Sequence, residues 1–284
     1  MRMPPIRAIS RTPLVRDWLA DTRQPRILHV FEDACNLVNE NGDVLSIVTQ
    51  KIGEGPFNLV IQENVSFSKY LAKESSVSIR GDGLVLGELI TTFAYAKVWH
   101  PRPEWEVLHG KKETILSRLD EFQIANDRDR SFDTDFITIQ SPLSNSLTAS
   151  LANADLPSAL TAAKKLAGLG MGLTPSGDDF LMGAILAAWI LHPGETASHL
   201  AKEIAETAAA LTTSLSAAWL RSAGRGEAGI LWHELFNSLL LNTDVKFPIA
   251  NILSTGETSG ADAFAGFVGV LTAYKERIID QCPS

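Results

Sequence analysis

The chain has 284 residues, of which 45% are hydrophobic and 20% are charged, so it can bury one large core or two smaller ones. Its formal net charge is −8, and residues 132–284 hold only 8 of the 25 basic residues but 15 of the 33 acidic ones. A nucleic-acid surface needs clustered Lys and Arg, so this composition argues against nucleic acid as a partner.

The cysteines and the apolar segments limit the class further. Cys35 and Cys282 show no metal-ligand spacing, so neither a disulfide framework nor a structural zinc site is expected. The Arg- and Pro-rich start lacks the apolar stretch of a secretory signal. The longest apolar run, Phe180 to Leu191, is shorter than a bilayer span and is typical of a buried helix. We therefore expect a cytoplasmic protein without a membrane partner.

The first half of the chain predicts a small β domain. Residues 1–25 are expected to form an irregular N-terminal arm, with up to two helical turns around Leu14 to Leu19. Residues 26–103 alternate apolar runs with turn sequences such as Asn41-Gly42-Asp43 and Gly81-Asp82-Gly83, which predicts a barrel or sandwich. The expected strands are RILHVF, ACNLVN, VLSIVTQ, FNLVIQ, SVSIRG, GLVLGE and YAKVW.

Residues 104–284 predict an all-α helical domain. The apolar residues from Leu108 to Phe122 share one helical face, and residues 126–135 form a charged loop. Apolar side chains at helical spacing from Leu200 to Trp219 predict one helix of five turns. The expected fold class is therefore α+β, with an N-terminal β barrel or sandwich followed by an all-α domain.

The densest motif is GLGMGLTPSGDD, from Gly168 to Asp179. It differs from a dinucleotide-binding fingerprint because Leu173 replaces a required glycine and a helical segment precedes it. It also differs from a P-loop, because Asp178 and Asp179 stand where the phosphate-binding lysine and its neighbour belong. Neither of these phosphate-binding loops therefore accounts for the motif.

The same pattern, S-G-x-D-x-x-x-G, occurs twice, and each copy opens an apolar helix. The copies run from Ser176 to Gly183 and from Ser259 to Gly266. In one interpretation each is a helix cap, because Ser and a later acid satisfy free N–H groups. In the other, two helix N-termini meet at a ligand site that favours an anion. Gly183 and Gly266 lie on the helix faces below the acids and are expected to allow a close crossing.

The acids of the first copy leave the ligand chemistry open. Either a cation such as Mg²⁺ joins Asp178 and Asp179 to a bound anion, or these carboxylates accept hydrogen bonds from ligand N–H groups. Thr212, Thr213, Ser214 and Ser216 form a hydroxyl cluster within the expected long helix. Its hydroxyls are expected either to bond to carbonyls one turn earlier or to face the ligand.

Four blocks of sequence resemble one bacterial family. GLGMGLTPSGDDFLMG resembles the signature of a former domain of unknown function that includes the AllH subunit of oxamate carbamoyltransferase. TTSLSAAWLRSAGRGE and GETSGADAFAG are similar to its later blocks, and GPFNLVI is similar to an N-terminal block. Glu257 departs from the pattern, which has His at this position, so a ligand contact there would leave the substrate's identity open.

The resemblance implies transfer of a carbamoyl group between carbamoyl phosphate and an amide such as oxamate, in purine (allantoin) catabolism. It also implies partner subunits like AllF and AllG, or a homo-oligomer. The alternative is a noncatalytic ligand-binding or assembly subunit in which the motifs are only helix caps.

Under the resemblance, Gly177 and Gly260 would bind the anion through their N–H groups. Asp179 and Asp262 would orient the amide or a metal, and Arg221 is the leading cation, although a helix C-terminus also attracts Arg. Asp179, Asp262 and Arg221 are thus the catalytic candidates, and the substrate-binding candidates are Gly172, Thr174, Ser176, Gly177, Asp178, Thr213, Ser214, Thr258, Ser259 and Gly260.

Overall fold

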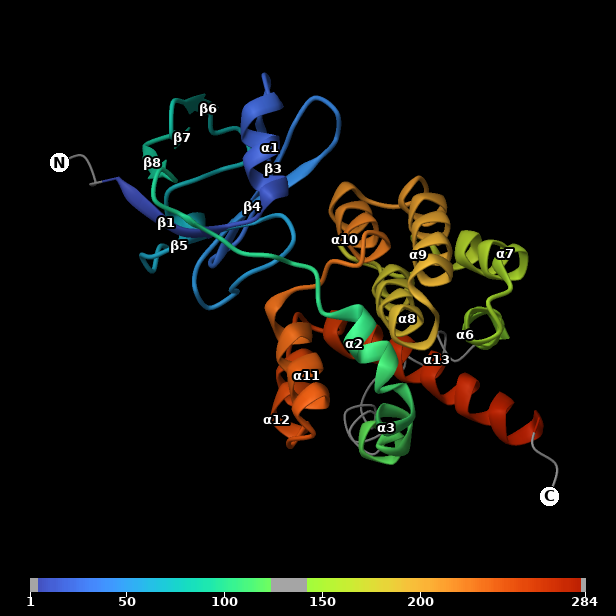
Figure 1. Ribbon diagram of the computed structural model, residues 1–284. Coiled ribbons are helices and arrows are strands. Elements are labelled where there is room, and N and C mark those ends of the chain that lie inside the picture. Colours follow the sequence, from blue (N-terminus) through green and yellow to red (C-terminus); the bar gives the residue numbers. More distant parts are fainter. Residues whose placement is uncertain (1–4, 124–141, 282–284) are drawn as a thin grey trace. The chain divides into compact units, whose positions relative to one another are not determined.

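The computed structural model describes residues 5–123 and 142–281, and the chain divides into two compact units, Met1–Pro101 and Arg102–Ser284 (Figure 1). The first unit is built on a β-sheet, and the described part of the second is helical. The predicted fold class is therefore confirmed. The charged loop expected at residues 126–135 lies outside the described residues.

The first unit is one mixed sheet that curls into a nearly closed barrel. Its strands lie in the order β2-β3-β4-β5-β1-β8-β7-β6, and β9 pairs with β1. A short 3-10 helix, η1, spans Phe67–Lys69. The strands are β1 (Ile6–Arg11), β2 (Arg26–Val30), β3 (Ala34–Val38), β4 (Val44–Val48), β5 (Asn58–Ile61), β6 (Val77–Arg80), β7 (Gly83–Leu86), β8 (Leu89–Thr92) and β9 (Lys97–Val98).

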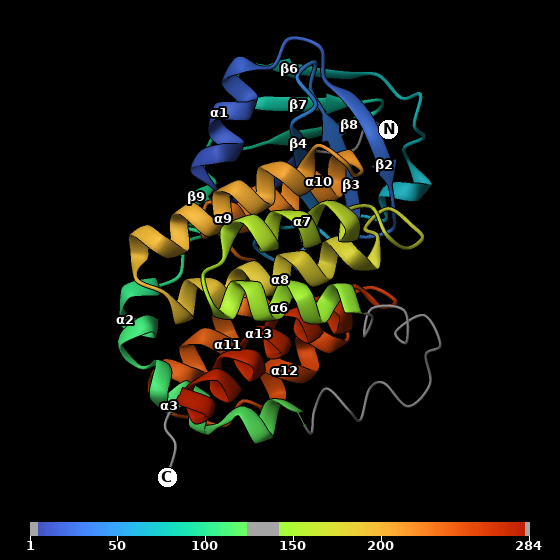
Figure 2. The ribbon, with the colours of Figure 1, turned by 90° about the vertical axis from the view of Figure 1, so that its right-hand side faces the viewer.

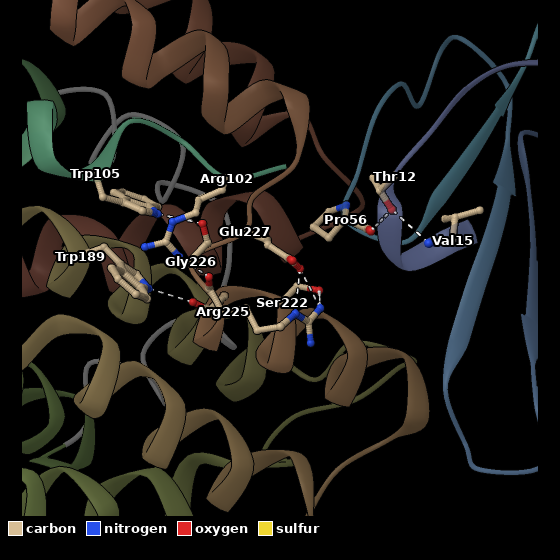
Figure 3. Close-up of polar contacts among 11 residues, drawn as sticks. Thr12, Val15, Pro56, Arg102, Trp105, Trp189, Ser222, Arg225, Gly226 and Glu227 are labelled. Atoms are coloured by element: carbon tan, nitrogen blue, oxygen red, sulfur yellow. Dashed lines mark hydrogen bonds and ion pairs between the residues drawn. The ribbon is translucent and has the colours of Figure 1, made fainter. Parts of the chain in front are cut away.

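The predicted arm is wrong in part, because Ile6–Arg11 form a strand, whereas the helical turns expected around Leu14 to Leu19 are confirmed. Strand β1 pairs antiparallel with β5 and parallel with β8, so it lies inside the sheet. Helix α1 (Pro13–Asp21) begins after Thr12, whose hydroxyl accepts from Val15 N–H at 3.2 Å and donates to the Pro56 carbonyl at 2.7 Å (Figure 3). Buried and outward positions alternate along β1, as is typical of a strand, and Arg7 and Arg11 occupy outward positions.

A separate apolar core fills the first unit. In-register residues such as Leu37 on β3 and Leu45 on β4 are fully buried within it. The predicted turns at Gly42 and Gly81 are confirmed, since both glycines adopt positive φ angles of 87° and 55°. Strand β8 was not predicted, because LITT follows the preceding strand after only a two-residue turn.

Helix α8 lies at the centre of the second unit. All of its residues except Ser176 and Met182 are buried, so the predicted buried helix is confirmed. Figure 2 shows α8 running between α9 and α13, and it packs against both helices. The helices are α2 (Trp105–Gly110), α3 (Lys112–Ser117), α6 (Pro142–Ala152), α7 (Leu156–Leu166), α8 (Ser176–Leu191), α9 (Gly194–Ala209), α10 (Ser214–Gly224), α11 (Ile230–Leu241), α12 (Lys246–Leu253) and α13 (Ser259–Gln281).

The predicted five-turn helix over residues 200–219 is wrong. Helix α9 ends at Ala209, and α10 begins at Ser214 after a short turn. The side chain of Thr213 caps α10 by accepting from the Ser216 N–H, so two of the hydroxyl residues precede the helix.

No helix in the described ranges is both long and apolar enough to cross a membrane.

Candidate functional site

Helices α8 and α13 cross where each carries a glycine. A Cβ on Gly183 would lie 1.7 Å from the Ala263 carbonyl oxygen, and one on Gly266 would lie 2.0 Å from that of Phe180. The predicted close crossing is therefore confirmed. The contact is reciprocal, because each glycine meets the carbonyl of the residue that directly follows the acid of the other motif. Ala263 follows Asp262, and Phe180 follows Asp179. Both acids of the repeated motif thus lie at one backbone-to-backbone contact.

The two motifs are also joined by side chains. The Thr174 hydroxyl, in the loop before α8, lies 2.9 Å from the hydroxyl of Ser259, the first residue of α13. Both hydroxyls lie close enough to Asp179 to favour its ionised form. We call the group formed by Thr174, Asp179, Ser259 and Asp262 the helix junction. The structure therefore brings together the threonine upstream of the first motif, the serine of the second and the acid of each.

The glycines after each serine act in packing. A Cβ on Gly177 would lie 2.1 Å from the Leu166 carbonyl oxygen, and one on Gly260 would lie 1.8 Å from that of Ile252. Their N–H groups already donate to backbone carbonyls, at 2.8 Å from Gly177 to Leu169 and 3.0 Å from Gly260 to Thr255. In this structure both N–H groups are therefore paired within the protein and are not available to bind an anion.

Asp178 is a structural acid. Its Oδ1 accepts from the Gly168 N–H at 2.8 Å, and its Oδ2 accepts from the Thr212 hydroxyl. Burial raises the pKa of Asp178, while these two hydrogen bonds act in the opposite direction. The side chain ties the start of the glycine-rich loop to the turn before α10. Thr212 was not among the predicted binding residues, although it belongs to the hydroxyl cluster that the sequence analysis identified.

Asp179 differs from its neighbour in hydrogen bonding. Its side chain is buried, at 7% exposure, and its Oδ2 has no hydrogen-bond partner among the described residues. Burial, assisted by the charges of Asp262 and Asp178, raises the pKa of Asp179 to about 8, against the weaker effect of the Ser259 and Thr174 hydroxyls. A neutral carboxylic acid is therefore expected at physiological pH.

The helix dipole opposes this shift at Asp179 but is too weak to cancel it. An acid in the first turn of a helix gains about 0.3–1 kcal/mol when it ionises. A pKa raised from 3.8 to about 8 corresponds to a penalty on the order of 6 kcal/mol for the ionised form. The cost of burying the charge therefore decides the protonation state of Asp179.

The remaining predicted residues line the loops around the junction. The Thr213 hydroxyl donates to the Leu173 carbonyl at 2.7 Å, so it holds the glycine-rich loop and does not bond one turn back. Ser214 is exposed, Ser176 and Thr258 are half-buried, and Gly172 has φ of 91° in an open part of the loop. The Thr258 carbonyl accepts from the Asp262 N–H at 2.9 Å, in the first turn of α13.

Arg221 is committed to a surface ion pair. Its Nε lies 3.2 Å from Glu206 Oε2 on α9, and both side chains are more than one-third exposed. Arg221 lies toward the C-terminal end of α10, whereas Thr213, which contacts the glycine-rich loop, caps the N-terminal end. The interpretation of Arg221 as a structural cation near a helix C-terminus is therefore favoured over a catalytic role.

The other arginine of this segment also has structural partners. Arg225 forms an ion pair with Glu227 at 2.7 Å, and its carbonyl accepts from Arg102 at 2.6 Å (Figure 3). The next carbonyl, that of Gly226, accepts from the Trp105 indole at 2.8 Å. These contacts fasten the end of α10 to the start of α2.

The described side chains around Asp178 and Asp179 do not form a set of metal ligands. In residues 5–123 and 142–281, no three or more His, Cys, Asp or Glu side chains are grouped to hold a metal. Both oxygens of Asp178 already accept protein hydrogen bonds. The predicted pair of Asp178 and Asp179 therefore lacks the ligand set of a metal site, and we assign no metal to it.

The chain is an α+β protein of two units. A barrel-like sheet is followed in sequence by a helical unit in which two helices open with Ser-Gly-x-Asp. Residues 166–271 match the family model described as oxamate carbamoyltransferase subunit AllH, and residues 7–98 match the AllH family N-terminal domain. The chain belongs to the AllH family. No solved structure shows a significant match to it.

Proposed function

We propose that this chain is a subunit of a carbamoyltransferase acting on an oxamate-type amide, and that the helix junction holds that substrate. The family match supports the reaction class. The observation that carries the site is the buried Asp179 Oδ2, which has no partner among the described residues and lies in a group with two hydroxyls. A buried polar atom without a partner is costly, so a ligand that pairs with it binds favourably.

The reaction needs positioning more than it needs a nucleophile from the protein. The amide nitrogen attacks the carbamoyl carbon of carbamoyl phosphate and forms a C–N bond. The C–O bond to phosphate breaks with its electron pair on the phosphate, which takes up the proton that the nitrogen loses. Catalysis of such a transfer depends on holding both reactants in line and stabilising the developing charge. The junction supplies hydroxyl and carboxyl groups for the amide, and partner subunits complete the enzyme.

The dipoles of α8 and α13 add a preference for a negative group. Both helices begin at the junction, where each dipole favours an anion by about 0.3–1 kcal/mol. Since the Gly177 and Gly260 N–H groups are paired, this contribution is a field effect and not direct N–H binding. The carboxylate of oxamate or the phosphate of carbamoyl phosphate is the negative group that we expect at the hydroxyls of the two helix ends, and not beside the Asp179 carboxyl.

Thr174 provides a matched test of the site. Thr174→Val keeps the shape but removes the hydroxyl, and Thr174→Ser keeps the hydroxyl. Loss of one substrate hydrogen bond in the valine variant is expected to lower carbamoyl transfer to oxamate about tenfold, with the serine variant near wild type. The assay measures phosphate release by the chain combined with its partner subunits, and melting temperatures are compared in parallel.

The competing function is a noncatalytic assembly subunit. The packing roles of Gly177, Gly260 and Asp178 favour it, because they explain much of the repeated motif without a ligand. Under this alternative, Thr174→Val leaves activity per folded complex unchanged. Unchanged activity together with no heat of binding for oxamate or carbamoyl phosphate would reject our proposal.

A further inference from the structure

The helix junction has the hydrogen-bonding character of a site for a primary amide, an inference that rests on the proposed function. We propose that Asp179, as a neutral carboxylic acid, recognises the H₂N–C=O group of the substrate by donating its O–H to the amide oxygen and accepting an amide N–H. The two hydrogen bonds are parallel, so the carboxyl group contacts both the oxygen and the nitrogen of the amide.

One oxygen of the Asp179 carboxyl is buried without a hydrogen-bond partner among the described residues. The Thr174 and Ser259 hydroxyls lie close to Asp179, yet its Oδ2 has no partner among the described residues and is shielded from solvent. A protonated carboxyl has one donor and remaining acceptor capacity, whereas an ionised one only accepts. A buried neutral acid that donates to a substrate oxygen has precedent in enzyme active sites.

The charges around Asp179 also favour a neutral ligand group. The side chains that influence Asp179 within the described residues are the carboxyls of Asp178 and Asp262 and the hydroxyls of Ser259 and Thr174. None of these is a cation, and both charged neighbours disfavour a second negative group beside Asp179. A carboxylate presented to Asp179 would be repelled, whereas a neutral amide would not.

The crossing of α8 and α13 holds Asp179 in a fixed position. The reciprocal contacts of Gly183 and Gly266 place the backbone directly after each acid against the other helix. Asp179 is therefore held by packed helices and not by a flexible loop. Rigid placement is what a two-point contact with a planar group requires.

The test compares an amide with its carboxylate analogue. Calorimetry on the full chain at neutral pH is expected to show oxamate binding at least about tenfold tighter than oxalate, which replaces the amide by a carboxylate. Asp179→Asn, which keeps one donor and one acceptor, is expected to bind oxamate within about threefold of wild type. Asp179→Leu, which keeps neither, is expected to lose at least about tenfold.

Controls separate folding from recognition. Glu195→Gln removes an exposed acid from the first turn of α9 and is expected to leave binding unchanged. Melting temperatures show whether each variant folds, and only folded variants are compared. If Asp179→Leu fails to fold, the asparagine variant and the oxamate–oxalate comparison decide alone.

The outcomes distinguish this inference from the proposed function. Equal affinity for oxamate and oxalate, or loss of oxamate binding in a folded Asp179→Asn variant, would overturn the amide contact while leaving the junction as the substrate site. Absence of binding by wild type for both oxamate and carbamoyl phosphate would reject the proposed function and this inference together.

Discussion

Asp178 and Asp179 are adjacent and both buried, but their surroundings give them different chemistry. Asp178 has hydrogen-bond donors at both oxygens, from Gly168 and Thr212, whereas Asp179 has an oxygen with no partner among the described residues. The sequence placed Asp179 among the catalytic candidates and Asp178 among the substrate-binding ones, but it gave no sign that both oxygens of Asp178 accept hydrogen bonds from the protein. The difference depends on which loops fold back onto α8, and that is a tertiary property.

The raised pKa of Asp179 predicts how stability changes with pH. Because burial raises this pKa from 3.8 to about 8, the folded chain holds a proton that the unfolded chain releases above about pH 4. The free energy of unfolding should therefore fall as pH rises from about 4 to 8, by up to about 1.4 kcal/mol per pH unit from this group.

Asp179→Asn removes this titration, so its stability should change less over the same pH range. Urea unfolding at several pH values, with wild type and variant side by side, measures the difference. Parallel pH profiles for the two proteins would show that Asp179 titrates normally. Glu74→Gln serves as the control, since Glu74 is exposed in a turn outside the helices and its removal should leave the wild-type profile in place.

At the scale of helices, the crossing of α8 and α13 predicts the effect of one methyl group. Gly183→Ala places a Cβ against the Ala263 carbonyl and should destabilise the fold by about 1–3 kcal/mol or more, despite the higher helix propensity of Ala. Gly110→Ala is the matched control, because a Cβ there meets nothing within 4 Å. Thermal unfolding measures both, and equal melting temperatures would contradict the close crossing.

Periodicity predicted elements well where one signal acted alone. The buried run of α8 and the turns at Gly42 and Gly81 follow directly from local sequence. The apolar stripe through residues 200–219 failed because it continues across Thr213, whose capping preference stops one helix and starts the next. Strand β1 was missed because apolar Ile9 lies at an outward position and polar Ser10 at a buried one, and because its partners lie far along the chain.

The repeated motif shows how far residue patterns predict a site. Its repetition correctly predicted that Gly183 and Gly266 lie at a crossing. The roles given to Gly177, Gly260 and Arg221 depended on what else contacts them, namely the Leu169 and Thr255 carbonyls and Glu206. Such contacts between distant segments leave no periodic signal in one sequence.

For the whole molecule, the two apolar cores predict separable losses of structure. Leu37 is fully buried in the core of the first unit and Leu186 in that of the second. Leu37→Ala should cost about 2–5 kcal/mol and reduce hydrogen-exchange protection in β2–β5, while α8 and α13 stay protected. Leu186→Ala should give the reverse pattern. Equal loss throughout both units in either variant would show that they unfold as one.

The position of β1 also constrains how the first unit is made. Its Ala8 pairs with Ile61 and its Ile6 with Thr91. Strand β1 therefore leaves the ribosome well before the strands with which it pairs. Contacts of such long sequence separation slow folding and leave strand edges exposed meanwhile. A nascent chain arrested before β8 emerges would therefore carry an unpaired edge on β1, and it should bind chaperones or aggregate until Leu89–Thr92 has been synthesised.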